Sequence, residues 1–169
     1  MKSRSLALYG LLIALSFVLS YIETLIPLYL GAPGVKLGLA NLVTVIALYS
    51  MGAGQAAAIS LIRILLTGFT FGSLSSVLFS AAGAALSLLV MVAAKATKWF
   101  GMTGVSVLGG VSHNLGQFLV AAFVVETFGV FAYAPVLIAA GTGAGAVIGL
   151  LGGMILKRIS GYISRTGVR

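Results

Sequence analysis

Long apolar runs, separated by short polar or turn-forming stretches, divide the chain into six segments. Leu, Ile, Val, Ala and Phe dominate each run, and few charges interrupt them. Continuous apolar character over such lengths is typical of membrane-spanning helices rather than of surface helices or strands. We therefore predict an all-α integral membrane protein, a single transmembrane domain built as a six-helix bundle. Its spans are expected at about residues 6–26, 37–50, 54–67, 77–94, 104–125 and 135–156.

The second and third segments are shorter than the roughly 20 residues that normally cross a bilayer. A glycine-rich turn at residues 51–55 joins them. We expect these helices to extend into their flanking loops, to lie in a thinned region, or to pack around an opening. Outer loops are predicted at residues 27–36, 68–76 and 127–134, and the first of them is rich in Pro and Gly.

The composition supports the membrane setting, since 60% of residues are hydrophobic, 7% are charged and the mean hydropathy is +1.20. A soluble domain carries about 25% charged residues. Cysteine is absent, which excludes disulfides, thiolate catalysis and zinc–cysteine sites, and Asp is absent as well. We expect neither a metal nor a cofactor. The first segment follows Lys2 and Arg4 as a signal peptide would, but it exceeds the usual apolar length of about 7–15 residues and lacks a cleavage pattern. We interpret it as a retained span.

The net charge of +8 reflects membrane topology rather than nucleic-acid binding. Eight of the ten basic residues lie at one set of span ends or in the tails: Lys2, Arg4, Lys95, Lys98, Lys157, Arg158, Arg165 and Arg169. Lys and Arg accumulate on the cytoplasmic side of a membrane protein. This distribution predicts six helices with both termini cytoplasmic, in a prokaryotic-type cell membrane. Such a basic face would also attract anionic lipid.

The most conspicuous polar stretch lies inside the fifth segment, at residues 112–117 (SHNLGQ). On a helix, Gln117 lies one turn from His113 and Asn114, so the three side chains share a face. Unpaired polar groups in hydrocarbon are costly and normally face a bundle interior or a cavity. Two interpretations remain open here. The three residues form the floor of a binding pocket, or they only hold helices together through hydrogen bonds.

A second polar set falls in the predicted outer half of the membrane and comprises Glu23, Lys36, Asn41, Arg63 and Glu126. Isolated ions are costly in a medium of low dielectric constant, so these groups should pair with one another or hold a ligand. Glu23 with Arg63, and Lys36 with Glu126, are plausible pairs. One alternative is that the ion pairs are purely structural, and Arg63 alone could also extend to the interface. We predict an outward-opening pocket for a ligand. Its floor is His113, Asn114 and Gln117, and its wall holds Asn41 and Arg63 with Glu23 nearby. Lys36 and Glu126 lie at its mouth, and the loop at residues 27–36 is its lid.

Small residues mark two further surfaces. Ala7, Gly10 and Ala14 lie on neighbouring turns of the first segment, where a helix from another subunit could approach closely. Four glycines in the last segment follow a strict four-residue spacing: Gly141, Gly145, Gly149 and Gly153. We expect this glycine stripe to pack against a neighbouring helix.

Several kinds of transport protein are excluded by what the sequence lacks. No phosphate-binding G-x-x-x-x-G-K-[ST] motif is present, so the chain should not hydrolyse ATP by itself. No convincing internal repeat indicates a secondary transporter. A channel would need polar residues along a whole pore, whereas these crowd into one half of the membrane.

Two motifs resemble the Gx transporter family, namely residues 36–44 (KLGLANLVT) and 113–117 (HNLGQ). Members of that family often carry the label heptaprenyl diphosphate synthase component I. The six short spans also resemble the substrate-binding S-components of energy-coupling factor (ECF) transporters. The resemblance extends over residues 5–159.

The resemblance to S-components implies capture of a small molecule from outside, of vitamin-like, flavin-like or quinone/isoprenoid-precursor type. It also implies docking to a scaffold membrane subunit driven by two ATPase subunits. Where the usual docking pattern is Ala-x-x-x-Ala, this chain has Gly10 and Ala14. The synthase label conflicts with the chemistry, since prenyl elongation needs Asp-rich magnesium sites and this chain has no Asp. We therefore expect no enzymatic activity; the alternative is a non-catalytic membrane component that assists prenyl diphosphate or menaquinone synthesis.

Overall fold

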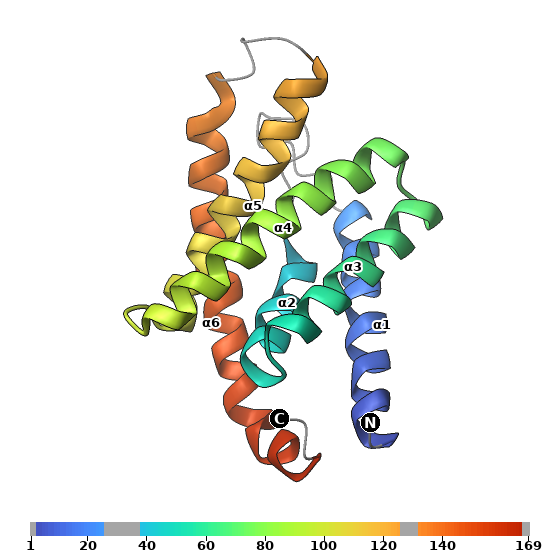
Figure 1. Cartoon of the computed structure of the whole chain (residues 1–169), viewed down its shortest axis with the longest axis vertical. Helices are drawn as coiled ribbons and strands as arrows, with labels where there is room; N and C mark the ends of the chain where they lie inside the picture. Colours follow the sequence, from blue (N-terminus) through green and yellow to red (C-terminus); the bar gives the residue numbers. More distant parts are fainter. Residues whose placement is uncertain (1–2, 26–37, 126–131, 167–169) are drawn as a thin grey trace.

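A computed structural model describes residues 3–25, 38–125 and 132–166, and every element of regular structure in these ranges is helical apart from one short 3₁₀ turn. The six helices are α1 (Ser3–Leu25), α2 (Leu39–Ser50), α3 (Ala53–Thr70), α4 (Leu74–Thr97), α5 (Met102–Val125) and α6 (Ala134–Thr166). The start of α1 and the end of α6 lie at the same end of the molecule (Figure 1). Six helices therefore occur where the apolar runs predict them.

Glycines bring α4, α5 and α6 into the closest packing of the molecule. A methyl group added at Gly141 would lie 2.8 Å from the Gly110 carbonyl oxygen of α5, and one at Gly145 would lie 2.7 Å from that of Ser106. On the other side of α5, a methyl group at Gly116 would lie 2.7 Å from the Ala82 carbonyl oxygen of α4. These helices approach backbone to backbone because no side chain intervenes.

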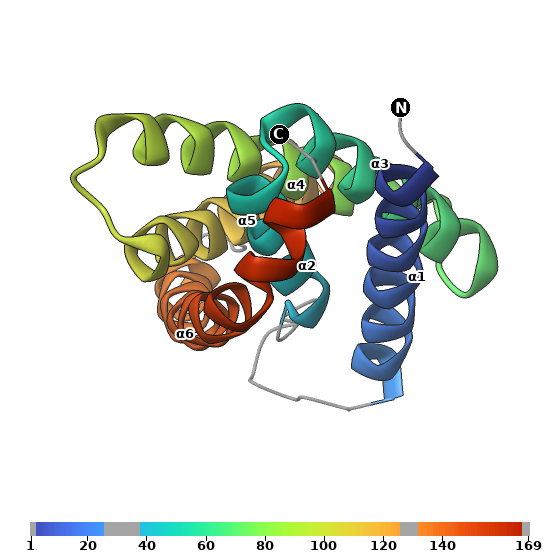
Figure 2. The same cartoon turned by 90° about the horizontal axis from the view of Figure 1, so that it is seen from below.

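The short helix α2 is the buried centre of the other half of the molecule. It packs against α1, α3 and α6 (Figure 2), and Val43, Ala47 and Leu48 are almost fully buried there. Its two ends are held by side chains of other helices. The Gly38 N–H, just before α2, donates to the Glu23 carboxylate of α1. The Lys95 ammonium of α4 donates to the Leu48 carbonyl oxygen at 2.7 Å, near the other end.

Several helix boundaries differ from the predicted ones, and three of them change the loops or the length of the last helix. Helix α3 continues to Thr70 and α4 already begins at Leu74, so the loop expected at residues 68–76 is only a tight turn. Ser73 caps α4, accepting a hydrogen bond from the Ser76 N–H at 3.2 Å while its own N–H donates to Ser76 Oγ. At the other end of the chain, α6 runs to Thr166, ten residues beyond the predicted 156. Lys157 and Arg158 end the apolar run, but they do not end the helix because Lys and Arg are good helix formers.

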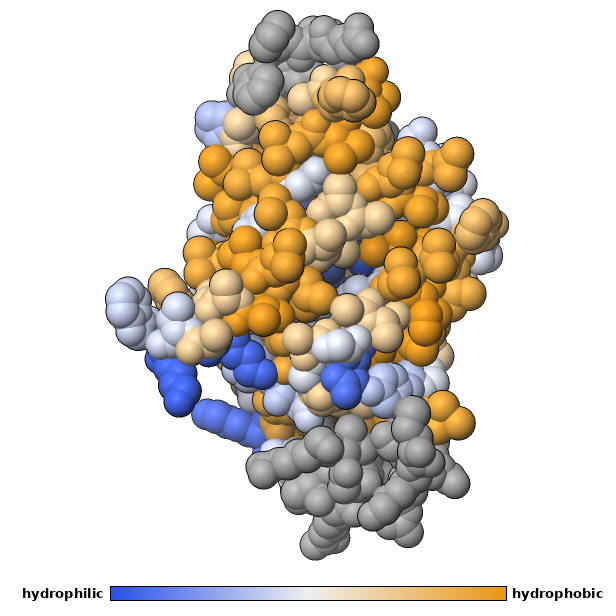
Figure 3. Space-filling model, viewed as in Figure 1, coloured by the Kyte–Doolittle hydropathy of each residue, from blue (hydrophilic) through white to orange (hydrophobic). Residues whose placement is uncertain are grey.

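The outer surface is apolar over most of the visible face (Figure 3). Phe69, Leu89 and Phe123 are examples of side chains that are at least 70% exposed. Five helices are long and apolar enough to cross a membrane, whereas α2 has only 12 residues. A hydrophobic exterior of this extent is typical of a protein surrounded by lipid. The six-span count stays a prediction, as does the orientation of the termini.

Candidate functional site

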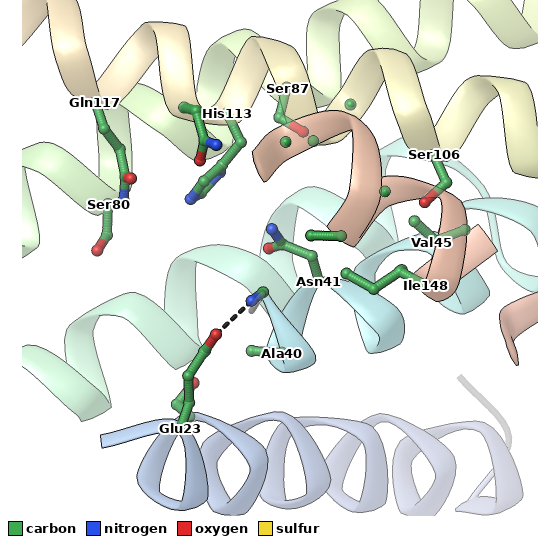
Figure 4. Close-up of a pocket in the computed structure, with 18 of the residues that line it drawn as sticks. Glu23, Ala40, Asn41, Val45, Ser80, Ser87, Ser106, His113, Gln117 and Ile148 are labelled. Atoms are coloured by element: carbon green, nitrogen blue, oxygen red, sulfur yellow. Dashed lines mark hydrogen bonds between the residues drawn. The ribbon is translucent and has the colours of Figure 1, made fainter. Parts of the chain in front are cut away.

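A cavity of about 70 Å³ lies among the six helices, and each of them contributes to its wall. We call it the inner cavity. A water molecule needs roughly 10–15 Å³ on this measure, so the space holds several waters or one compact chemical group. Its lining combines polar side chains with small or apolar residues such as Val45, Gly110 and Ile148 (Figure 4). A polar chamber inside an apolar exterior fits the binding of a solute better than it fits simple core packing.

Six of the eight predicted ligand-binding residues line this one cavity: Glu23, Asn41, Arg63, His113, Asn114 and Gln117. They come from α1, α2, α3 and α5, so residues up to 94 positions apart in the sequence meet in space. Lys36, Glu126 and the lid predicted at residues 27–36 lie outside the described residues. The two polar sets of the sequence are therefore parts of a single site in space.

Arg63 is directed into the bundle and not toward the surface. Its side chain is only 9% exposed, which rules out extension to the membrane interface. One terminal nitrogen donates to the Ser20 hydroxyl at 3.3 Å, and the Ser20 hydroxyl in turn donates to the Ser16 carbonyl oxygen at 2.9 Å. The Arg63 Nε–H is buried and has no hydrogen-bond partner among the described residues. A buried donor of this kind costs free energy until an acceptor reaches it.

Glu23 supplies the negative charge beside this arginine. Its carboxylate acts electrostatically on Arg63 and accepts the hydrogen bond from the Gly38 N–H (Figure 4). Gly38 has φ 72°, a left-handed conformation that glycine adopts without strain. Glu23 thus lines the same cavity as Arg63, the partner suggested by the sequence, and it also holds the start of α2.

His113 and Gln117 of α5 can lie close to α4 because the α4 residue opposite them, Gly83, has no side chain. A methyl group at Gly83 would lie 2.7 Å from the Gln117 side chain and 2.8 Å from the His113 carbonyl oxygen. Gln117 points toward Ser80 of α4, while His113 projects toward the cavity (Figure 4). The Asn114 side-chain nitrogen donates to the Leu137 carbonyl oxygen of α6 at 2.8 Å. Of the three residues, Asn114 therefore also contributes to helix association.

Hydroxyl groups are the lining residues that sequence reasoning missed. Ser20, Thr67, Ser80, Ser87 and Ser106 all face the inner cavity. A serine or threonine within an apolar helix gives little signal, because its hydroxyl can bond to its own backbone. The Thr67 hydroxyl does so, donating to the Ile64 carbonyl oxygen at 3.2 Å. The seven-residue spacing of Ser80 and Ser87 could have placed these two on one face of a helix.

A second, more open recess of about 400 Å³ adjoins the first. We call it the vestibule. Thr67, Phe71 and Ser80 line both spaces, and the vestibule is further bounded by the turn between α3 and α4. The Phe71 ring lies 5.5 Å from that of Phe17 and 5.6 Å from that of Tyr21, measured between ring centroids. Phe71 therefore lines both spaces and packs in an aromatic cluster with Phe17 and Tyr21.

The small residues of α1 face outward. Ala7, Gly10 and Ala14 are exposed, and a methyl group added at Gly10 would meet nothing within 4 Å. By contrast, Gly141, Gly145 and Gly149 of the α6 stripe lie against the α5 backbone, while the fourth glycine, Gly153, has only the Met102 sulfur at 4.0 Å. The two stripes of small residues therefore occupy different settings.

The described part of the chain contains no group of three or more His, Cys, Asp or Glu side chains placed to hold a metal ion. The cavity instead offers one guanidinium, one carboxylate, amides, an imidazole and several hydroxyls. Such a set can orient a polar solute by hydrogen bonds and by charge.

These features define an all-helical, multi-pass membrane protein with a polar chamber in its interior. The model of the family described as heptaprenyl diphosphate synthase component I matches residues 12–155, and the chain belongs to that family. Searches of curated proteins and of solved structures found no match.

Proposed function

We propose that this protein is a substrate-binding membrane subunit, similar to the S-components of energy-coupling factor transporters. It takes a small molecule from outside the cell membrane and passes it on for ATP-driven uptake by partner subunits. The observation that carries the proposal is the inner cavity, where buried Arg63 lies with Glu23, Asn41, His113 and Gln117 inside an apolar bundle. Buried charges and amides in such a setting are costly unless they pair with one another or hold a ligand, and here they surround a cavity.

The proposal includes partners and an orientation. A scaffold membrane subunit carrying two ATPases would dock on the exposed face of α1, at Ala7, Gly10 and Ala14. With both termini in the cytoplasm, the vestibule and the turn between α3 and α4 lie toward the outside. The chain itself performs no catalysis in this scheme, in keeping with the lack of Asp and Cys.

The family description favours a second candidate, a non-catalytic membrane component that assists prenyl diphosphate or menaquinone synthesis. The protein would then hold an intermediate or anchor a synthase at the membrane. Purification alone separates the two: a transport subunit should copurify with ATPase and scaffold subunits, whereas an assisting component should copurify with a prenyl synthase.

The test of ligand binding is native mass spectrometry of the protein extracted gently from its own membrane. We expect a retained small molecule in the wild-type protein. Gln117→Ala should weaken its retention about ten-fold, because a ligand group loses its hydrogen-bond partner. Thr142→Ala is the matched control, since Thr142 is exposed on α6 and its hydroxyl donates to the Ile138 carbonyl oxygen of its own helix.

Two outcomes would contradict the proposal. One is the absence of any retained molecule together with unchanged unfolding temperatures across a broad panel of small molecules. The other is elongation of a prenyl diphosphate by the purified chain alone, which would make the protein an enzyme.

A further inference from the structure

The charges around the inner cavity restrict what can bind there. In the described part of its wall, the only charged side chains are Arg63 and Glu23, which are opposite in sign. The start of α2 adds a partial positive charge of roughly +0.5, since its Gly38, Ala40 and Asn41 residues line the same space. The balance is weakly positive. One negative charge on a ligand can be accommodated, whereas the several charges of a diphosphate would remain largely uncompensated.

The hydrogen-bonding state of Arg63 indicates where that single charge would lie. A guanidinium carries five N–H donors in a fixed fork, and a carboxylate is the acceptor that matches this geometry best. Ser20 takes one donor, and the buried Nε–H has no partner among the described residues. An acceptor group of the ligand inside the inner cavity would satisfy it.

The size of the two chambers indicates a ligand in two parts. About 70 Å³ suffices for a compact head group, while about 400 Å³ in the vestibule accommodates a larger body. Arg63 and Thr67 of α3 and Phe71, the residue just after that helix, follow at four-residue steps, so they mark one side about 12 Å long. Phe71 is held by Phe17 and Tyr21, and it presents an aromatic surface on which a flat ring can stack.

We propose that the ligand is a flat, ring-bearing monocarboxylate whose carboxylate binds Arg63 in the inner cavity while its ring lies against Phe71 in the vestibule. This inference rests on the proposed function and narrows it to one class of substrate. It separates this site from one built for prenyl diphosphates, because a diphosphate head would carry more negative charge than the described part of the cavity wall neutralises.

The test uses three probes on detergent-purified wild-type protein: 2-naphthoate, its neutral isostere 2-naphthamide, and inorganic pyrophosphate. Calorimetry should show naphthoate binding at least ten-fold tighter than naphthamide, because charge-assisted hydrogen bonds are the stronger ones. Pyrophosphate should not compete with naphthoate. Equal affinity for the acid and the amide, or tighter binding of pyrophosphate, would overturn the proposal without requiring any variant to fold.

Two variants then locate the probe. Arg63→Gln should remove the preference for the acid, whereas Arg158→Gln, a surface arginine near the end of α6, should keep it. Phe71→Leu should weaken naphthoate and naphthamide equally, by about three- to ten-fold. Phe123→Leu is its control, because that ring is 84% exposed on the outer face. Unchanged binding in both Arg63→Gln and Phe71→Leu would also overturn the proposal.

Failure of this inference differs from failure of the proposed function. If the wild-type protein retains a native molecule that is neutral or multiply charged, only the ligand class is wrong. If it retains no molecule and binds no probe, the proposed function is wrong, and the inference with it.

Discussion

Two helices of this protein carry small residues at four-residue spacing, and they use them in opposite ways. In α6, Gly141, Gly145 and Gly149 lie against the backbone of α5 with no room for a methyl group. In α1, Gly10 and Ala14 are exposed, and no described residue lies within 4 Å of a methyl group added at Gly10. The pattern indicates where a helix can approach closely, but it does not say whether that helix belongs to the same chain. A stripe left open in one subunit is a candidate contact for another.

The largest expected effect comes from adding a side chain to the closed stripe, which consists of Gly141, Gly145 and Gly149 of α6 packed against α5. Gly145→Leu would force a side chain into the Ser106 carbonyl oxygen of α5, at the 2.7 Å where even a methyl group clashes. We expect a loss of about 3 kcal/mol in the free energy of unfolding, or failure to yield monodisperse protein. Thermal unfolding in detergent measures the change.

Gly143→Leu is the matched control on the same helix, since a methyl group there meets nothing within 4 Å. It should leave the unfolding temperature close to that of the wild-type protein. Equal destabilisation by the two variants would mean that leucine itself, and not the clash with α5, disturbs α6.

Adding side chains to the open stripe, Gly10 and Ala14 of α1, should not change the stability of the isolated protein. Gly10→Leu or Ala14→Leu adds bulk on an exposed face, so the isolated subunit should unfold at an unchanged temperature. If a scaffold subunit docks there, the added side chain should weaken the complex by about 1–3 kcal/mol, which corresponds to a roughly five- to 150-fold lower affinity. Copurification of the complex should fall accordingly. Retention of the complete complex in both variants would place the contact elsewhere on the protein.

The smallest effect concerns the polar contact beside the closed stripe. Asn114→Ala removes the hydrogen bond to the Leu137 carbonyl oxygen between α5 and α6. Such bonds contribute roughly 0.6–2 kcal/mol in membrane proteins, well below the cost of the glycine clash. Chemical unfolding of the variant checks the value. A loss as large as that of Gly145→Leu would show that hydrogen bonding, rather than glycine packing, dominates this contact.

Sequence reasoning located the six helices because long apolar runs and glycine-rich turns are strong local signals. It misjudged the ends of α3, α4 and α6. Gly68 falls in the loop predicted at residues 68–76, yet it belongs to α3. Because it has no side chain, Val77 of α4 can pack directly against it. Lys157 marked the end of the apolar run, but a helix can continue into water beyond it. Apolar length predicts the extent of the membrane segment, and not the extent of the helix.

For the site, polarity within apolar runs was an effective guide to Arg63, His113 and Gln117. It could not show that these residues share one cavity with Glu23, because that depends on how α1, α3 and α5 cross. Nor could it separate Asn114, which bonds to a neighbouring helix, from residues that only line the space. Serines such as Ser87 gave too weak a signal on their own. Their place in the wall follows only from the glycine-permitted approach of α5 to α4.

Helix α2 has only 12 residues and is about 18 Å long. It is therefore too short to cross a bilayer core of about 30 Å. The contacts of Glu23 before its first turn and of Lys95 near its last replace the solvent that such ends would otherwise need. Hydrophobic mismatch therefore does not act on α2, since its ends meet protein rather than lipid. The bilayer need not thin around it. The length of α2 therefore matches the spacing of two contacts on other helices and need not match the thickness of the membrane.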